Sequence, residues 1–131
     1  MKHRVFNCTR QTLVVSELEV AETVWSRMRG LLGRRAEEFP SGRGLWITPS
    51  EGIHTMGMTF PIDVAYLDSE GRVIRTYHRL APFRIAAIKF RARGILELPA
   101  GTLAQSHTEV GDLLQFLVSQ DERVELCAAV V

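Results

Sequence analysis

Short β-type segments separated by turn residues run along almost the whole chain, and they restrict its fold more than any other feature. These segments are rich in Val, Ile, Leu and Tyr, and turn residues recur about every 8–12 positions between them. The expected strands cover residues 4–8, 13–20, 44–47, 53–68, 73–77, 94–98, 113–118 and 124–130, and the fourth of these segments is interrupted around Gly57 and Pro61. Long helical crossovers between them are absent, which disfavours a parallel α/β sheet. The sequence therefore predicts a mainly β fold, either a mostly antiparallel β-sandwich or a partly open barrel.

Local patterns add three details to this fold. The alternation of apolar residues in 13–20 slips at Ser16 and Glu17, as it does at a β-bulge. The turn residues 68–71 are expected to join two strands into a hairpin. Residues 101–107 are expected to hold a short helical turn.

One amphipathic helix is expected near residues 22–33. Apolar side chains recur there at spacings of three and four, which places them on one stripe that can pack against the sheet. They are Ala21, Val24, Trp25, Met28, Leu31 and Leu32. Gly33 suits the end of this helix, and the two arginines after it suit its negative pole.

Composition places the chain among ordinary globular domains. Its 131 residues fit a single domain spanning 1–131, and 46% of them are hydrophobic and 24% charged. The formal net charge is only +1, so the total charge does not point to nucleic acid or to an anionic membrane. No segment reaches the roughly 18 apolar residues that span a bilayer, so no membrane partner is expected.

The N-terminus and the cysteines predict a cytoplasmic location. Residues 1–15 have no continuous apolar run before a cleavage-type site, unlike a secretory signal. Cys8 and Cys127 are the two cysteines, and they lack the close spacing of zinc or redox motifs. Both are expected to be buried thiols that stay reduced, although pairing of the terminal strands would bring them close together.

Several motifs in a fixed order resemble a known family. They are Arg29–Arg34, His54–Met58, Pro61–Asp68, Pro82, Ile95–Gly101 and Val110–Asp112. In this order they resemble the family called domain of unknown function 192, over about residues 20–116. The resemblance implies a compact, jelly-roll-like β-sandwich with one packed helix, and it implies no agreed activity.

His54, Met56 and Met58 are the most suggestive group for ligand chemistry. Residues two apart on a strand point to the same face, so one imidazole and two thioethers would line up there. Such soft donors suit Cu(I). However, methionine commonly fills gaps in a core, and Gly57 can break the strand. Lining of a core or a pocket is therefore expected rather than a metal site.

Asp63 and Glu97 are acids within apolar strand sequences. A carboxylate in this setting faces solvent or is buried with a partner, because an unpaired buried charge is costly. The structural interpretation is an internal brace to Arg29 or Arg34. The functional interpretation is a pair of acids on either side of a cleft, as hydrolases use.

The charge distribution is more informative than the total charge. Residues 72–93 contain seven basic residues and no acid. They are Arg72, Arg75, Arg79, Arg84, Lys89, Arg91 and Arg93, with Tyr77, His78, Phe83 and Phe90 among them. Such a stretch can bind a phosphate backbone or stack bases. Pairing with the acidic residues beyond 109, or exposure on a solvated face, is the favoured interpretation, which disfavours nucleic acid.

No catalytic motif is recognised, and no cofactor or metal is predicted, because GxSxG, HExxH and P-loop patterns are missing. The leading hypothesis is a non-enzymatic binding domain for an unknown small molecule or protein. Its predicted site comprises His54, Met56, Met58 and Asp63, with Glu97 and Arg34 as polar neighbours. One alternative is a small hydrolase or metal-assisted enzyme using Asp63, Glu97 and His54. The other is a module for nucleic acid or an acidic partner using residues 72–93.

Overall fold

The structure is a computed structural model that describes residues 3–23, 31–89, 91–118 and 127. Its elements in chain order are β1 (His3–Asn7), β2 (Thr12–Ala21), the 3-10 turn η1 (Ala36–Glu38), β3 (Arg43–Ile47), β4 (Ile62–Leu67), β5 (Val73–Leu80), β6 (Gly94–Pro99), the short helix α2 (Thr102–Gln105) and β7 (Leu114–Leu117). The predicted mainly β class is confirmed.

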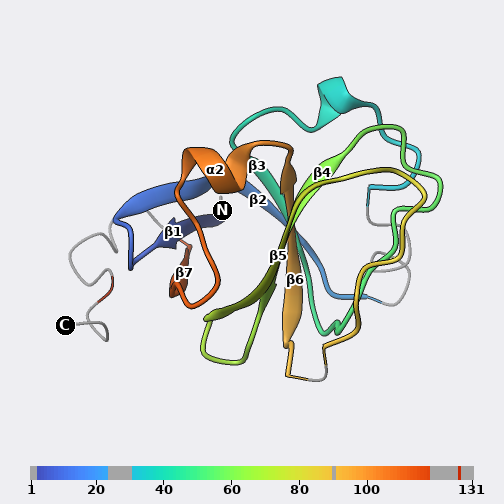
Figure 1. The fold of residues 1–131 in the computed structure, drawn as a ribbon. Helices are drawn as coiled ribbons and strands as arrows, with labels where there is room; N and C mark the ends of the chain where they lie inside the picture. The colour runs from blue at the N-terminus through green and yellow to red at the C-terminus, as the bar shows by residue number, and fades with distance from the viewer. Residues whose placement is uncertain (1–2, 24–30, 90, 119–126, 128–131) are drawn as a thin grey trace.

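The described strands form one seven-stranded sheet in the order β5-β4-β6-β3-β2-β1-β7. The sheet curls into a half-barrel, with α2 near one end (Figure 1). All neighbouring strands are antiparallel except β2 and β3, which are parallel. The predicted sandwich of jelly-roll type is not confirmed, because the described strands belong to one curled sheet rather than to two stacked ones.

Each face of the sheet carries its own hydrophobic cluster. The first contains Val5, Val15, Leu18, Ala65, Leu96, Leu98 and Leu114, together with Leu103 of α2. The second lies on the opposite face of β3, β6 and β4, where the connecting segments cover it. It contains Leu31, Phe39, Leu45, Met58, Phe60, Ile62, Val64, Tyr66 and Ile95. Since alternate residues of β4 and β6 enter different clusters, both strands are buried on both faces.

The predicted bulge and hairpin are confirmed. Between β1 and β2 the register moves from His3↔Leu18 to Val5↔Val15, so the extra residue of β2 lies at Ser16 or Glu17. Strands β4 and β5 pair as an antiparallel hairpin across residues 68–72. The predicted helical turn appears as α2.

Other predicted elements differ from the structure or fall beyond it. Residues 53–61 were expected to be β-like with interruptions around Gly57 and Pro61. Apart from one bridge at His54 the whole segment is irregular, and Gly57 turns the chain at a φ of 84°. The predicted helix near 22–33 depends mainly on residues 24–30, which lie outside the described residues. Most of the predicted strand 124–130 lies outside them too.

The prediction of two reduced thiols is wrong, because Cys8 and Cys127 form a disulfide with their Cα atoms 5.4 Å apart. Gln115 of β7 supports this link, since its side-chain oxygen accepts a hydrogen bond from the Cys127 amide at 2.6 Å. Disulfides are typical of oxidising compartments. The cysteines therefore do not support the predicted cytoplasmic location. None of the helices in the described part of the chain has the length and apolar character that crossing a bilayer requires.

Candidate functional site

Asp63 is a fully buried carboxylate whose hydrogen bonds all go to the backbone. Its Oδ2 accepts from the amides of Gly101 and Leu103 at 3.0 and 2.9 Å, and its Oδ1 accepts from the amide of Arg79 at 2.8 Å. The amides of residues 101 and 103 belong to the start of α2, where a short helix leaves donors unpaired. Asp63 therefore fixes α2 and the end of β5 to β4.

Glu97 is the second buried acid, and its carboxyl group has far fewer hydrogen-bond partners than that of Asp63. It lies on β6 between Leu45 of β3 and Val64 of β4, and its Oε2 is buried without a hydrogen-bond partner among the described residues. Burial among apolar side chains raises the pKa of Glu97 to about 8, and the nearby positive charge of Arg34 only partly opposes this. The carboxyl group is therefore mostly protonated at neutral pH.

Arg34 is committed to a different acid. Its two terminal nitrogens donate to Glu19 of β2 at 2.9 and 2.8 Å, a two-pronged ion pair that lowers the pKa of Glu19. Glu19 lies opposite Leu45 in the register, and Leu45 lies opposite Glu97, so the two acids share one face of the sheet. The predicted brace from Asp63 or Glu97 to Arg34 is therefore not formed, because Arg34 pairs with Glu19, while Arg29 lies outside the described residues.

Asp63 and Glu97 do not meet in one cleft. Val64 pairs with Glu97 and shares its face, so the preceding residue, Asp63, points to the other face of the sheet. The hydrolase hypothesis required both acids on one side of a substrate. It is wrong in that form.

His54, Met56 and Met58 are also separated. His54 is exposed and forms a β-bridge with Ile85, and Met56 is exposed too. Met58 is buried in the second hydrophobic cluster. The turn around Gly57 breaks the alternation that would have aligned them. In the described residues, no group of three or more His, Cys, Asp or Glu side chains is placed to hold a metal ion.

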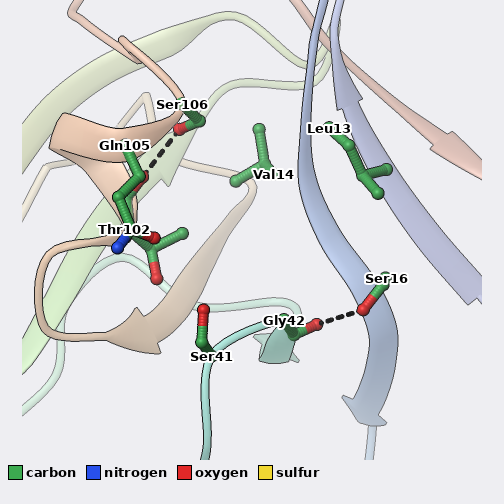
Figure 2. Close-up of a pocket in the computed structure, with 8 residues that line it drawn as sticks. All are labelled: Leu13, Val14, Ser16, Ser41, Gly42, Thr102, Gln105 and Ser106. Atoms are coloured by element: carbon green, nitrogen blue, oxygen red, sulfur yellow. Dashed lines mark hydrogen bonds between the residues drawn. The ribbon is translucent and has the colours of Figure 1, made fainter.

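The structure instead places a polar pocket between β2, α2 and the loop that leads into β3 (Figure 2). Its volume is about 140 Å³, and every described residue that lines it is uncharged. The lining residues are Leu13, Val14, Ser16, Ser41, Gly42, Thr102, Gln105 and Ser106. The pocket therefore offers hydroxyl and amide groups beside two aliphatic side chains.

The walls of this pocket are set by the bulge in β2. The bulge frees the amides of Ser16 and Glu17, and both donate to the carbonyl of Gly42 at 2.8 and 3.1 Å. Gly42 has a φ of 93°, and a Cβ there would come within 2.7 Å of the Ser16 hydroxyl oxygen. Only glycine lets the loop approach β2 this closely, which brings Ser41 to the pocket.

The opposite wall is positioned by Asp63 and Thr12. Asp63 holds the first turn of α2, which carries Thr102 and Gln105. The Thr12 hydroxyl donates to the carbonyl of Ser106 at 2.7 Å and so ties β2 to the end of α2. Asp63, predicted as a binding residue, is therefore a residue that positions the pocket.

The polar groups of the pocket divide into paired and free ones. The Ser106 hydroxyl donates to the Thr102 carbonyl at 2.8 Å, and the Ser16 hydroxyl donates to Gly42 at 3.1 Å. By contrast, the side chains of Ser41, Thr102 and Gln105 make no hydrogen bond with the part of the chain that the structure describes. In Figure 2 the hydroxyl groups of Ser41 and Thr102 point into the space between them.

The basic residues of 72–93 are spread along β5 and the loop after it. Arg72 donates to the carbonyl of Gly111 at 2.8 Å, and the guanidinium of Arg75 stacks over the Tyr77 ring at 4.7 Å. Both contacts are internal. The prediction of nucleic-acid or acidic-partner binding by this stretch remains a prediction.

The chain is similar to a known family and to several proteins over most of its length. The family model DUF192, described as Uncharacterized ACR, matches residues 5–116. A UPF0127 protein of Thermococcus sibiricus is 29% identical over 122 residues, which cover 89% of this chain and 77% of the relative. A UPF0127 protein of Pyrococcus horikoshii is 33% identical over 105 residues, or 76% and 87% of the two chains.

Two solved structures share the fold. A protein of unknown function from Novosphingobium aromaticivorans has a TM-score of 0.73 at 18% identity, over 88% of this chain and 84% of its own. A Sinorhizobium meliloti protein described as a candidate transcription regulator has a TM-score of 0.73 at 22% identity, over 88% and 92%. At these identities the likeness concerns the fold alone.

Proposed function

The chain belongs to the DUF192 family, which carries no assigned activity, and we propose that it is a small binding domain for a neutral, hydroxyl-rich ligand. The pocket between β2 and α2 is the proposed site. One observation carries the proposal: three polar side chains with free hydrogen-bonding groups line a pocket that contains no charge.

The chemistry of the lining selects the ligand class. Ser41 and Thr102 can each donate and accept, and Gln105 adds one acceptor and two donors. Leu13 and Val14 supply an apolar wall. A sugar ring presents hydroxyl groups at its edge and C–H groups on its faces, so it matches both kinds of surface. Because no charged residue lines the pocket, a phosphate or carboxylate would have no partner for its charge.

The size of the pocket limits the ligand to one ring. A cavity of about 150 Å³ holds a benzene molecule, and this pocket has a similar volume of about 140 Å³. A monosaccharide or cyclic polyol has about twice as many non-hydrogen atoms as benzene, so the pocket would enclose one edge of a single ring and leave the rest of the ring in solvent. The proposed ligand is therefore a single monosaccharide or cyclic polyol, or one such ring at the end of a longer molecule.

A titration of the full chain with monosaccharides and inositol, followed by NMR chemical shifts, tests the proposal. Ser41→Ala and Thr102→Val should each weaken binding about fivefold, the effect of one neutral hydrogen bond. Ser69→Ala is the matched control, since Ser69 is an exposed serine outside this pocket. Absence of saturable binding, or equal binding by the variants and the wild type, would overturn the proposal.

The predicted site around Glu97 is a second candidate, favoured by the unpartnered Oε2 of its buried carboxyl group. A ligand donor that reached this atom would supply the missing hydrogen bond. The same titration with His54→Ala and Glu97→Gln separates the candidates. Loss of binding in these two variants alone would move the site to the face of the sheet that carries Glu97.

A further inference from the structure

We infer that the loop of residues 83–89 is a contact surface for an anionic lipid bilayer. Four apolar side chains on this loop and on its neighbouring segment face solvent, and we call them the apolar loop surface. They are Met56, Phe83, Ile85 and Ile88, with exposed fractions of 46%, 60%, 80% and 66%. Single exposed apolar residues are ordinary, but a group on one loop marks an interaction site.

The apolar loop surface is built on a backbone that is firmly held. Residues 51–55 and 83–89 pair in antiparallel fashion, through Phe83 N to Thr55 O, Thr55 N to Arg84 O and Ala86 N to Ile53 O, at 2.7–2.9 Å. Figure 1 shows these segments on the side of the molecule away from β1 and β7. The pairing brings Met56 and Phe83 to one end of the loop.

Buried polar groups add to this support. The Tyr66 hydroxyl donates to the Ala87 carbonyl at 2.6 Å, and the Ala87 amide donates to the Tyr77 hydroxyl at 2.9 Å. The hydroxyl of the buried Thr55 donates to the Ala81 carbonyl at 2.7 Å. Ile85 and Ile88 are therefore presented to solvent by a fixed loop, which lowers the ordering cost of a contact.

The charged residues beside the apolar loop surface indicate which kind of partner it binds. The cations Arg84, Lys89 and Arg91 lie on or beside the loop, and Glu51 is the acid paired to it through backbone bonding with residue 89. The partner must therefore accept aliphatic side chains at its centre and carry negative charge around them. An anionic bilayer does both, since the isoleucines can enter the acyl boundary while the cations meet the headgroups.

Other partners would match either the apolar side chains or the cations, but not both. Nucleic acid would meet the cations but leave Ile85 and Ile88 in water. A second copy of this chain would cover the apolar residues but bring like charges together. The sequence prediction of no membrane partner depended on spanning length and total charge, and neither describes a surface contact.

Flotation of the full chain with vesicles tests the inference. One vesicle is pure phosphatidylcholine, and the other contains about one third phosphatidylserine. Binding is expected to the anionic vesicles at low salt and should fall when ionic strength is raised to about 0.5 M. Arg84→Gln and Lys89→Gln should each weaken it about fivefold. Absence of binding to anionic vesicles at low salt would overturn the inference.

Loop variants separate this contact from charge attraction alone. Ile85→Ser with Ile88→Ser should weaken binding at least about tenfold, because both side chains would leave the acyl boundary. Val110→Ser is the matched control, because Val110 is 59% exposed but lies between α2 and β7, away from the loop. Equal binding by the loop variant and the wild type would overturn the inference. So would a dimer, seen by light scattering, that only the loop variant abolishes.

Discussion

Asp63 and Glu97 are buried acids that lie diagonally across β4 and β6, and their surroundings differ completely. Asp63 accepts hydrogen bonds from three backbone amides, whereas Glu97 has a buried oxygen without a partner. The two carboxyl groups point to opposite faces of the sheet. Two acids in apolar strands thus look alike in the sequence. The face of the sheet that each side chain occupies decides whether its carboxyl group finds hydrogen-bond donors.

This difference predicts the largest effect for the removal of Asp63. Asp63→Ala leaves three amides without their acceptor, so we expect a loss of about 3–5 kcal/mol in the free energy of unfolding. Urea denaturation measures the loss, and Asp63→Asn, which keeps one acceptor oxygen, should lose less. A loss below about 1 kcal/mol for the alanine variant would show that these bonds are unimportant.

For Glu97 the comparison predicts that the ionised carboxyl group destabilises the fold, so that stability depends on pH. The folded protein keeps the Glu97 proton up to about pH 8, whereas the unfolded chain releases it near the ordinary pKa of 4.5. Rising pH therefore favours the unfolded chain between these values, and stability relative to Glu97→Gln should fall by a few kcal/mol across this window. Urea midpoints at several pH values measure it. Parallel curves for wild type and variant would contradict the raised pKa.

Arg34 should modulate Glu97 with a smaller effect. Arg34→Met removes a partly exposed ion pair with Glu19, which costs about 1 kcal/mol at most. It also removes the positive charge that lowers the pKa of Glu97 in the folded protein, so the pH-dependent fall should still begin near pH 4.5 but extend to higher pH and become larger. Arg43→Met is the matched control, because Arg43 pairs with Glu17 at 3.0 Å and has similar exposure. A fall that ends at the same pH in Arg34→Met as in the wild type would show that Arg34 does not act on Glu97.

The sequence was informative where a signal is local. Alternation of apolar residues predicted the β class and the bulge at Ser16 and Glu17, because a bulge leaves its mark within a few residues. Apolar context also singled out Asp63 and Glu97 as acids in need of partners. The partner of Asp63 was missed, since backbone amides leave no trace in side-chain identity.

The pocket could not have been predicted in the same way. Ser41, Thr102 and Gln105 are common polar residues in turn-like sequence, and no spacing relates them. Their proximity depends on the hydrogen bonds between Gly42 and β2 and on those between Asp63 and the start of α2. The disulfide was missed because the N-terminus predicted an intracellular location, whereas in the structure Gln115 of β7 contacts both Cys8 and Cys127.

The smallest expected effect tests the separation of the two acids itself. Asp63→Asn, Glu97→Gln and the double variant form a cycle, and their losses in unfolding free energy should add to within about 0.5 kcal/mol. Additivity is expected because the carboxyl groups lie on opposite faces and share no partner. A coupling above about 1 kcal/mol, measured at neutral pH by urea denaturation, would mean that the two groups share one environment. Such a coupling would revive a two-acid cleft, because only carboxyl groups on the same side of the sheet could sense each other so strongly.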